Sequence, residues 1–445
     1  MKEPSIRTFD SKIHEFVRTG FKPHFGKPTI AIKDDPEWRK VRDAGTRLWL
    51  DTGDMDEAGK LWNSSFEALT TNNTLLNKEI QKGIYDKLIV EAARAILDAT
   101  PAALPVASPL GEPLGRPGLD SRKLVLEIAF VLNAHHGLRL VDRFDAHVSV
   151  ELHTDLAADV AGTVAYGKRY FAICPERFYV KVPFTPAGLL GARKLVQAGV
   201  PINFTLGFSA RQNYLAALLT RPRYVNVFMG RLNSFVADSK LGDGVNVGEK
   251  ATLATQRELL QLRQSGRTTS LLIGASIRSG AQIGDLAGVD VLTMPPKAAA
   301  EYRAKPLPQV TARVNTDPAV TCAEGVTLQQ FNADTLWAVP AGFKECVEAL
   351  LKQDPDRLTA DTLQSHFATA GFGGLLPRWS DTDIKTVTAD GKIPVYRKWQ
   401  ARLQSGEIGL DALMNISALQ SFAVDQQALD DRIRSALKAA GLAIH

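Results

Sequence analysis

The sequence predicts an α/β fold, a parallel (β/α)8 barrel with an N-terminal helical segment and a largely helical C-terminal extension. Eight short runs of apolar and β-branched residues alternate with longer helical patterns, and nearly every run carries a polar residue near its end. Strands that alternate with helices indicate a parallel sheet, and eight parallel strands can close into a TIM barrel. An open doubly wound sheet shows the same alternation, so this pattern alone leaves both architectures open.

The elements of the expected barrel lie between about residues 48 and 296. The expected strands are 48–52, 68–73, 146–152, 178–183, 202–208, 224–231, 269–276 and 289–295. The helical patterns between them predict helices over 55–63, 77–97, 155–172, 187–199 and 248–265. Each strand is thus followed by a helix or a connecting segment, as parallel strands require.

The regions outside this alternation divide the chain. Residues 1–45 precede the first strand and are expected to pack on the outside of a barrel formed by 46–300. Residues 100–122 are rich in Pro and Gly and predict a loop inserted after the second strand. The extension, 301–445, contains helical patterns such as the last one, 416–440.

Two further segments of the extension carry predictions. Residues 347–353 predict another helix, and 377–394 are expected to form a loop that separates the two parts of the extension. The sequence therefore predicts one barrel domain followed by a helical extension.

Composition narrows the class of protein. The chain has 445 residues, 45% hydrophobic and 23% charged, which is enough apolar material for a sizeable core. The net charge of +5 is spread along the chain without a basic block, so nucleic acid is not an expected partner. Three cysteines, Cys174, Cys322 and Cys346, have no paired spacing, which argues against a disulfide framework or a zinc cluster. No signal peptide and no run of about 18 apolar residues is visible, so we expect no membrane segment and a cytoplasmic location.

Polar or charged residues interrupt nearly every expected strand near its C-terminal end. Barrel strands are buried on both faces, so polar groups there cost stability through desolvation. The C-terminal ends of barrel strands are also where the active sites of such enzymes lie. The interrupting residues are Asp51, Asn72, Glu151, Lys181, Asn203, Thr205, Asn226, Arg231, Ser276 and Arg278. The pattern therefore indicates catalysis at this end of the barrel.

Lys181, in FYVKVPF, is the most informative of these residues. Burial of an ammonium group lowers its pKa, and a neutral amine can attack a ketone to form an iminium that accepts electrons. A structural ion pair with Glu151 or Asp51 would also explain a buried lysine. The surrounding polar residues favour the catalytic interpretation.

The neighbouring strands supply groups for the proton transfers that Schiff-base chemistry needs. Glu151 could act as a general acid and base, directly or through a water that Thr205 helps to hold. Asp51 could take the proton from the hydroxyl next to the bond that is cleaved, and Asn72 and Asn203 suit sugar hydroxyls. Each residue taken alone is equally explained as a buried polar group with a structural partner.

Arg231, Ser276 and Arg278 predict an anion site. GASIRSG follows the seventh strand, and the loops after strands seven and eight often bind phosphate in barrels. The planar fork of arginine suits phosphate oxygens. We therefore expect an anionic substrate.

Seven ordered motifs carry a family resemblance. They are DTGD (51–54), TTNNTLLNKE (70–79), VSVEL (148–152), YVKVPFTPAG (179–188), INFTLGFS (202–209), VFMGR (227–231) and GASIRS (274–279). In order and spacing these residues resemble the transaldolase family over about 48–296. The segment SFAVDQQALDDRI (421–433) also resembles the family's closing helix.

The resemblance implies roles for individual residues. Lys181 would form the Schiff base, Glu151 would shuttle protons, Asp51 would act on the C4 hydroxyl of the donor, and Thr205 would hold the catalytic water. The expected substrate-binding residues are Thr70, Asn72, Asn203, Asn226, Phe228, Arg231, Ser276 and Arg278. Phe228 and Glu151 favour a transferase over the related fructose-6-phosphate aldolases, which carry Tyr and Gln at those places.

The resemblance also implies substrates and partners. It implies transfer of a dihydroxyacetone unit from fructose 6-phosphate or sedoheptulose 7-phosphate to an aldose phosphate, as in the pentose phosphate pathway. Neither a metal nor an organic cofactor is expected, and a homodimer is a family-level expectation.

Two residues depart from the family pattern and leave alternatives open. Asn73 stands where proline is common, and Asn226 stands where a small hydroxyl residue is typical. One alternative is the same chemistry on a ketose with another anion, such as a sulfonate. The other, suggested by the enlarged extension, is a barrel that binds sugar phosphates without catalysis.

Overall fold

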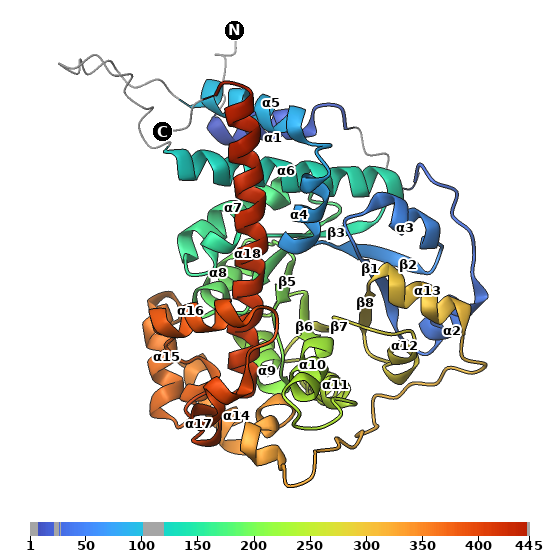
Figure 1. Cartoon of the computed structure of the whole chain (residues 1–445), viewed down its shortest axis with the longest axis vertical. Coiled ribbons are helices and arrows are strands. Elements are labelled where there is room, and N and C mark those ends of the chain that lie inside the picture. The colour runs from blue at the N-terminus through green and yellow to red at the C-terminus, as the bar shows by residue number, and fades with distance from the viewer. Residues whose placement is uncertain (1–7, 22–25, 27, 101–119, 443–445) are drawn as a thin grey trace, which may run out of the picture.

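The computed structural model describes residues 8–21, 26, 28–100 and 120–442 of the chain (Figure 1). The inserted loop expected over 100–122 therefore lies almost entirely outside the described residues. The N-terminal part of the chain forms two short helices, α1 and α2, and α1 contacts α5, α6 and α7, with Ile13 and Val17 buried. These two helices are α1 (Phe9–Arg18) and α2 (Pro36–Asp43), and their neighbours are α5 (Asp86–Ala99), α6 (Ser121–Phe144) and α7 (Val160–Ile173).

Eight parallel strands close into a barrel in sequence order, which confirms the predicted fold class. The strands are β1 (Arg47–Asp51), β2 (Phe66–Thr70), β3 (His147–Glu151), β4 (Phe178–Pro183), β5 (Ile202–Thr205), β6 (Tyr224–Phe228), β7 (Leu271–Ala275) and β8 (Val291–Met294). The open doubly wound sheet is excluded because β8 pairs back with β1, with Arg47 opposite Val291.

Helices cover the outside of the barrel, as the alternating pattern predicts. In addition to those named above they are α3 (Met55–Leu61), α4 (Asn73–Gln81), α8 (Pro186–Gln197), α9 (Ala210–Leu219), α10 (Met229–Asp238), α11 (Val247–Gln264), α12 (Ala281–Asp285) and α13 (Pro296–Ala304), with a 3₁₀ turn η1 (Thr154–Leu156). The single helix expected over 77–97 is wrong: the chain forms α4 and α5 with a turn between them. Gly83 adopts a φ of 76°, a left-handed conformation that suits glycine and ends α4.

An aromatic layer fills the barrel below the polar ends of its strands. Because side chains alternate along a strand, Trp49 points to the same side of β1 as Asp51, and Tyr179 points to the same side of β4 as Lys181. Tyr224 of β6 packs with these two rings. The Trp49 and Tyr224 rings lie 4.7 Å apart, and those of Tyr179 and Tyr224 lie 5.2 Å apart. The polar residues therefore lie above an apolar floor.

The extension is helical over most of its length beyond 327. Its elements are η2 (Leu328–Phe331), η3 (Ala333–Leu336), α14 (Ala341–Leu351), η4 (Pro355–Arg357), α15 (Ala360–Thr369), η5 (Gly373–Leu375), α16 (Asp381–Asp390), α17 (Tyr396–Gln404) and α18 (Leu410–Ala439). The loop expected over 377–394 is wrong, because α16 lies within it. Ser380 and Asp383 form a capping box there, and Val387 is the buried residue of this mostly polar helix, which explains why its apolar pattern is weak.

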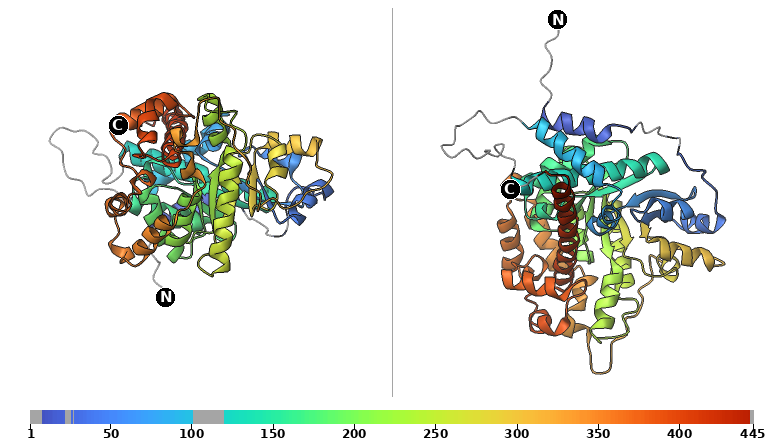
Figure 2. Two further views of the ribbon diagram at one scale, coloured as in Figure 1. Left: turned by 90° about the horizontal axis from the view of Figure 1, so that it is seen from below. Right: turned by 45° about the horizontal axis from the view of Figure 1, so that its top comes forward.

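The long helix α18 joins the extension to the barrel. Figure 1 shows it running from the extension helices past α4 to the region of α5, and it contacts α4, α5, α6 and α16. Figure 2 shows α14 to α17 gathered on one side of the barrel, away from α2, α3 and α13. The extension therefore borders one part of the barrel's circumference.

One helix in the described part of the chain, α6, is long and apolar enough to cross a membrane. Its most apolar window is 83% buried inside the fold. This burial is that of a core helix, since α6 packs against α1, α5 and β3.

Candidate active site

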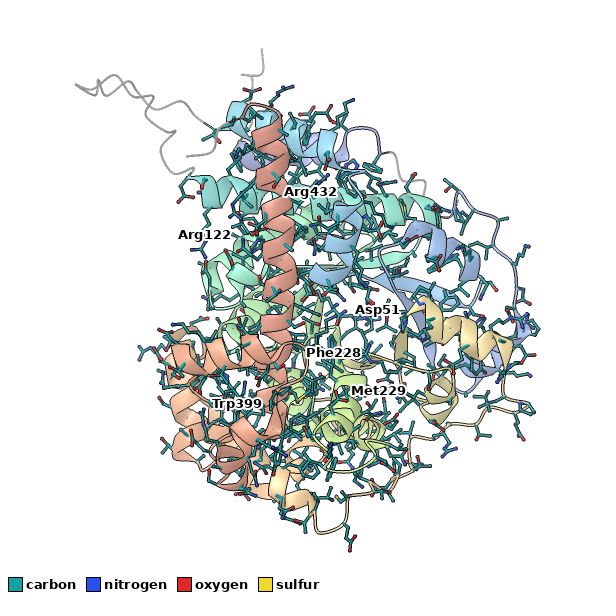
Figure 3. All side chains as sticks on the ribbon, in the orientation of Figure 1. Asp51, Arg122, Phe228, Met229, Trp399 and Arg432 are labelled. Carbon is teal, nitrogen blue, oxygen red and sulfur yellow. The ribbon has the colours of Figure 1, made fainter. Side chains whose placement is uncertain are left out.

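A cavity of about 410 Å³ opens at the C-terminal end of the barrel strands, next to α18. Figure 3 labels Asp51 and Phe228, two of its lining residues, at this end. Ten of the predicted site residues line the cavity: Asp51, Thr70, Asn72, Lys181, Asn203, Asn226, Phe228, Arg231, Ser276 and Arg278. Glu151 and Thr205, the other two, are buried next to these residues on neighbouring strands. The sequence pattern therefore identifies one place in the fold.

Strand pairing explains why these residues meet. In the parallel ladders Glu151 stands opposite Lys181, Lys181 opposite Asn203, and Asp51 opposite Thr70. Some predicted strands extend too far: Asn72 lies in the loop after β2, and Arg231 lies in the first turn of α10. These shifts leave both residues at the same end of the barrel, because all parallel strands end there.

Lys181 and Glu151 form a buried ion pair. Lys181 Nζ lies 3.3 Å from Glu151 Oε2, and each side chain is 4% exposed. Lys181 Nζ also donates a 2.9 Å hydrogen bond to the backbone oxygen of Thr71. The amine is thereby held inside the barrel, with its direction fixed by an acceptor and a carboxylate.

Burial shifts the pKa values of both site carboxyls upward. Desolvation raises the pKa of Glu151 to about 7, and the attraction of the Lys181 charge opposes this rise. Desolvation also raises the pKa of Asp51, against the charge of Lys181 and a 2.6 Å hydrogen bond from Thr70 Oγ1 to Asp51 Oδ1. Carboxyls with raised pKa values can both accept and return protons near neutral pH.

Several buried polar atoms at the site have no hydrogen-bond partner among the described residues. They are Asn203 Oδ1 and Thr205 Oγ1, and Glu151 Oε2 has the Lys181 ion pair but no hydrogen bond of good geometry. The amide nitrogen of Asn203 is already used, since it donates to Ser149 Oγ at 3.1 Å. Buried polar groups are nearly always paired, so unpaired atoms grouped around a lysine indicate a site that binds polar ligand atoms.

Asn72 and Asn226 also have structural partners. Asn72 Oδ1 accepts from Leu75 N at 2.8 Å and caps α4, while Asn226 Oδ1 accepts from Gly207 N at 3.1 Å. Each side-chain oxygen is thus engaged with backbone, and the NH2 groups are the parts of these side chains that can donate to a ligand.

Arg231 and Arg278 form the cationic end of the cavity. Gly230 lets the first turn of α10 pack against the loop after β7, because a Cβ atom at this position would lie 2.1 Å from Ser276 O and 2.7 Å from Arg278 Nε. Burial lowers the pKa of Arg231 to about 10, with a further contribution from the Arg278 charge. Burial also lowers the pKa of Arg278. The charges of the two desolvated guanidinium groups repel each other, so binding of an anion at this end of the cavity would stabilise both.

The cavity also contains residues that the sequence analysis missed. They include Lys78, Ser234, Thr293, Lys392, Ile393 and Phe422. Thr293 is a polar residue near the end of the eighth strand, so the rule applied to the other strands would have found it. Lys392, Ile393 and Phe422 come from the extension, where no local pattern indicates contact with the barrel.

A family comparison agrees with this geometry. The family model described as Transaldolase/Fructose-6-phosphate aldolase matches residues 48–339, more than half of the chain. The chain belongs to this family. The match covers the barrel strands except for the first residue of β1, and it ends before α14, so the cavity residues Lys392, Ile393 and Phe422 lie outside it.

Named relatives support the same class of enzyme. A transaldolase of Xanthomonas campestris pv. campestris (strain B100) is 28% identical over 324 residues, which are 69% of this chain and 94% of the relative. A transaldolase of Methylibium petroleiphilum is 27% identical over 290 residues, 63% of this chain and 82% of the relative. A transaldolase of Prochlorococcus marinus subsp. pastoris is 26% identical over 260 residues, which are 57% of this chain and 72% of the relative. Family membership and these relatives support an enzyme of the aldolase and transaldolase class.

Proposed function

We propose that the protein is a transaldolase that transfers a dihydroxyacetone unit from fructose 6-phosphate or sedoheptulose 7-phosphate to an aldose phosphate, through a Schiff base on Lys181. The observation that carries the proposal is the buried contact between Lys181 Nζ and Glu151 Oε2, 3.3 Å apart, beside a cavity that also contains Asp51. A lysine and two carboxyls are the groups that this reaction requires.

In the first half-reaction Glu151 takes a proton from Lys181, and the neutral amine attacks the C2 carbonyl of the ketose. Glu151 then returns the proton to the hydroxyl of the carbinolamine, which leaves as water and yields an iminium. A carboxyl whose pKa burial raises to about 7 suits both steps. Thr205 Oγ1, which has no hydrogen-bond partner among the described residues, would hold a water that carries these protons.

Carbon–carbon cleavage then uses Asp51 as a base. Asp51 takes the proton of the C4 hydroxyl, the C3–C4 bond breaks, and its electron pair moves into the iminium to give an enamine. The aldose phosphate leaves as an aldehyde. The enamine attacks the carbonyl of the acceptor aldose phosphate, Asp51 returns its proton to the new hydroxyl, and water releases the product ketose from Lys181.

The cationic end of the cavity supports phosphorylated substrates. Arg231 and Arg278 would bind the terminal phosphate of donor and acceptor through charge-assisted hydrogen bonds, with the Ser276 hydroxyl as a further donor. By family resemblance, Phe228 and Glu151 favour transfer to a second sugar over release of free dihydroxyacetone.

An exchange assay tests the proposal. We expect the protein, incubated with fructose 6-phosphate and erythrose 4-phosphate, to form glyceraldehyde 3-phosphate and sedoheptulose 7-phosphate in equal amounts. Lys181→Met should abolish exchange, whereas Lys194→Met, at an exposed position on α8, should not.

Other products would identify the alternatives. Free dihydroxyacetone without sedoheptulose 7-phosphate would indicate an aldolase, and preference for a 6-sulfo ketose would indicate a different anion. Sugar phosphate binding with no turnover of any donor would contradict the proposal and indicate a binding barrel.

A further inference from the structure

The extension supplies every partner that the structure gives to the Arg231 guanidinium. Arg231 Nη1 donates to the backbone oxygen of Lys392 at 3.0 Å, and Nη2 donates to Ser421 Oγ at 3.5 Å. The guanidinium carbon also lies 5.7 Å from the centre of the Phe422 ring. All three partners lie beyond residue 339, where the family match ends.

Arg231 needs such partners because its environment is unfavourable for a cation. Its residue exposure is 7%, and burial and the neighbouring Arg278 lower its pKa. A carbonyl oxygen, a hydroxyl oxygen and an aromatic face each offer partial negative charge to a guanidinium. The Asp425 carboxylate, also on α18, adds attraction from a longer distance.

The loop 391–393 presents its carbonyl in a fixed position. Asp390, at the end of α16, accepts hydrogen bonds from Val395 N at 2.9 Å and Trp399 Nε1 at 3.4 Å and pairs with Lys398. Ser417 Oγ of α18 donates to the Lys392 oxygen at 3.4 Å. The loop is thus anchored on both sides, and the Lys392 carbonyl is an acceptor arranged before any ligand binds.

The turn of α18 that carries Ser421 and Phe422 packs against the barrel. The Phe422 ring lies 6.4 Å from that of Phe228, and both line the cavity. Because Phe228 is the last residue of β6, this contact joins the extension to a barrel strand at the cavity.

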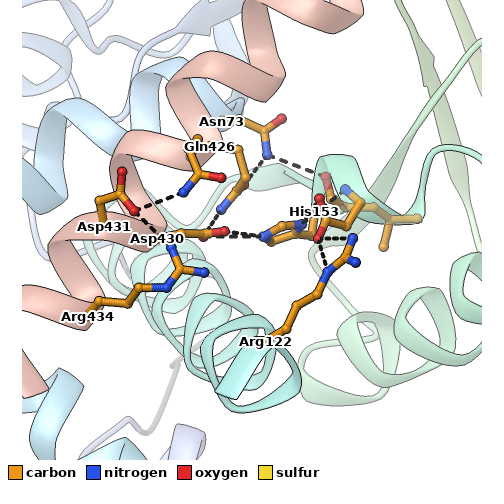
Figure 4. A network of polar contacts seen from close by, with 10 residues as sticks. Asn73, Arg122, His153, Gln426, Asp430, Asp431 and Arg434 are labelled. Carbon is orange, nitrogen blue, oxygen red and sulfur yellow. Dashed lines mark hydrogen bonds and ion pairs between the residues drawn. The ribbon is translucent and has the colours of Figure 1, made fainter. Parts of the chain in front are cut away.

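One turn further along, α18 is anchored by a buried polar network (Figure 4). Asn73 Nδ2 donates to Gln426 Oε1 at 2.7 Å, Gln426 Nε2 donates to Asp430 Oδ1 at 2.8 Å, and His153 Nε2 contacts Asp430 at 3.2 Å. His153 Nδ1 accepts from the backbone of Asp155, so its other nitrogen carries the hydrogen toward Asp430. The network fixes the helix against the first residue of α4 and the loop that follows β3.

We propose that the loop 391–393 and the turn of α18 with Ser421 and Phe422 orient the Arg231 guanidinium for a tetrahedral anion at the end of the sugar substrate. Ser421 and Phe422 are positioning residues, since they act on the substrate through Arg231. The inference rests on the proposed function for the identity of the sugar. It assigns to the extension a contribution, made through Arg231, to the affinity for the charged end of the substrate, separate from the chemistry at Lys181.

Two variants of the full-length protein test this assignment. Phe422→Leu removes the aromatic face, and we expect KM for fructose 6-phosphate to rise roughly two- to thirtyfold, with kcat within about twofold of the unchanged protein. Ser421→Ala removes a long hydrogen bond, so a rise of about two- to fivefold is expected. Calorimetry with inorganic phosphate should give a Kd weakened by the same factor, whereas exchange with unphosphorylated fructose should not change.

Matched controls separate positioning from folding. Phe422→Tyr keeps the ring and should restore KM to near its original value. Val424→Ala and Ser435→Ala replace exposed residues of the same helix and should leave KM and the phosphate Kd unchanged.

The outcomes distinguish this inference from the proposed function. Equal losses with phosphorylated and unphosphorylated sugars, or an unchanged phosphate Kd in Phe422→Leu, would overturn the positioning role while leaving transaldolase activity intact. Failure of the protein without substitutions to exchange sugars would contradict the proposed function. A weaker phosphate Kd in Phe422→Leu would in that case still support the positioning role.

Discussion

Lys181 Nζ and Glu151 Oε2 lie 3.3 Å apart on adjacent strands, in a register that sets the two residues directly opposite each other. Both side chains are almost fully buried, so Glu151 is the base that lies beside the amine. Catalysis therefore requires that Glu151 be free to accept the proton of Lys181, so that the two groups together hold a single proton.

The first prediction concerns pH. Burial raises the pKa of Glu151 to about 7, so a second proton enters the pair as the pH falls through this value. With the lysine and the carboxyl both protonated, the site has neither a free amine nor a base. We expect kcat/KM to fall roughly tenfold per pH unit below about 7. Measurements should use both fructose and fructose 6-phosphate, because a phosphate group titrates near pH 6 itself.

Glu151→Gln provides the comparison for this profile. The variant should lose most of its activity and also the acidic limb. An acidic limb of unchanged midpoint in Glu151→Gln would show that another group is responsible.

Asp51 gives a second prediction, through Thr70. The hydrogen bond from Thr70 to Asp51 stabilises the ionised carboxylate, so Thr70→Val should raise the pKa of Asp51 further. A larger fraction of Asp51 is then protonated at a given pH, and less base is available to accept the C4 hydroxyl proton. We expect a lower kcat near neutral pH, which recovers as the pH rises. A kcat reduced equally at every pH would point to displaced substrate instead.

Arg278 carries a third prediction. Its guanidinium has no hydrogen bond or ion pair in the described part of the chain, and it lines the cavity near Arg231. Charge-assisted hydrogen bonds contribute about 1.5–3 kcal/mol, so Arg278→Gln should raise KM for phosphorylated sugars roughly ten- to a hundredfold. Steady-state kinetics with phosphorylated and unphosphorylated donors checks this, and equal effects on both would contradict an anion-binding role.

The polar contact between Asn73 and Gln426 allows a stability prediction. Asn73→Ala leaves the buried amide of Gln426 without this partner, which should lower the free energy of unfolding by about 1–3 kcal/mol. Urea unfolding of Asn73→Ala, Gln426→Ala and the double variant measures the coupling. Additive losses would mean that the hydrogen bond contributes nothing to holding α18 on the barrel.

The barrel and most cavity residues could be predicted from the sequence because both depend on local patterns. Buried parallel strands are apolar, so Lys181 or Asn226 within such a run is visible as an exception. The ends of all eight strands meet at one face, which brings these exceptions together without knowledge of long-range contacts. The division of 77–97 at Gly83 and the helix within 377–394 were missed because the apolar periodicity is continuous in the first and weak in the second.

The contribution of the extension could not be predicted in this way. Phe422 lies on a helix whose apolar residues indicate burial but do not indicate which element they pack against. Lys392 contacts Arg231 through its backbone oxygen, which every residue type has. Likewise, the side-chain oxygen of Asn72 caps α4, a use that depends on where the helix begins, while binding of sugar hydroxyls by Asn72 stays a prediction. Such contacts depend on tertiary packing.

Trapping of the covalent intermediate tests the central claim most directly. The protein is incubated with fructose 6-phosphate, reduced with borohydride, digested and analysed by mass spectrometry. We predict a reduced three-carbon adduct on Lys181 and none in Lys181→Met. An adduct on Lys78 or Lys392, which line the same cavity, or no adduct in protein that exchanges sugars, would contradict the account.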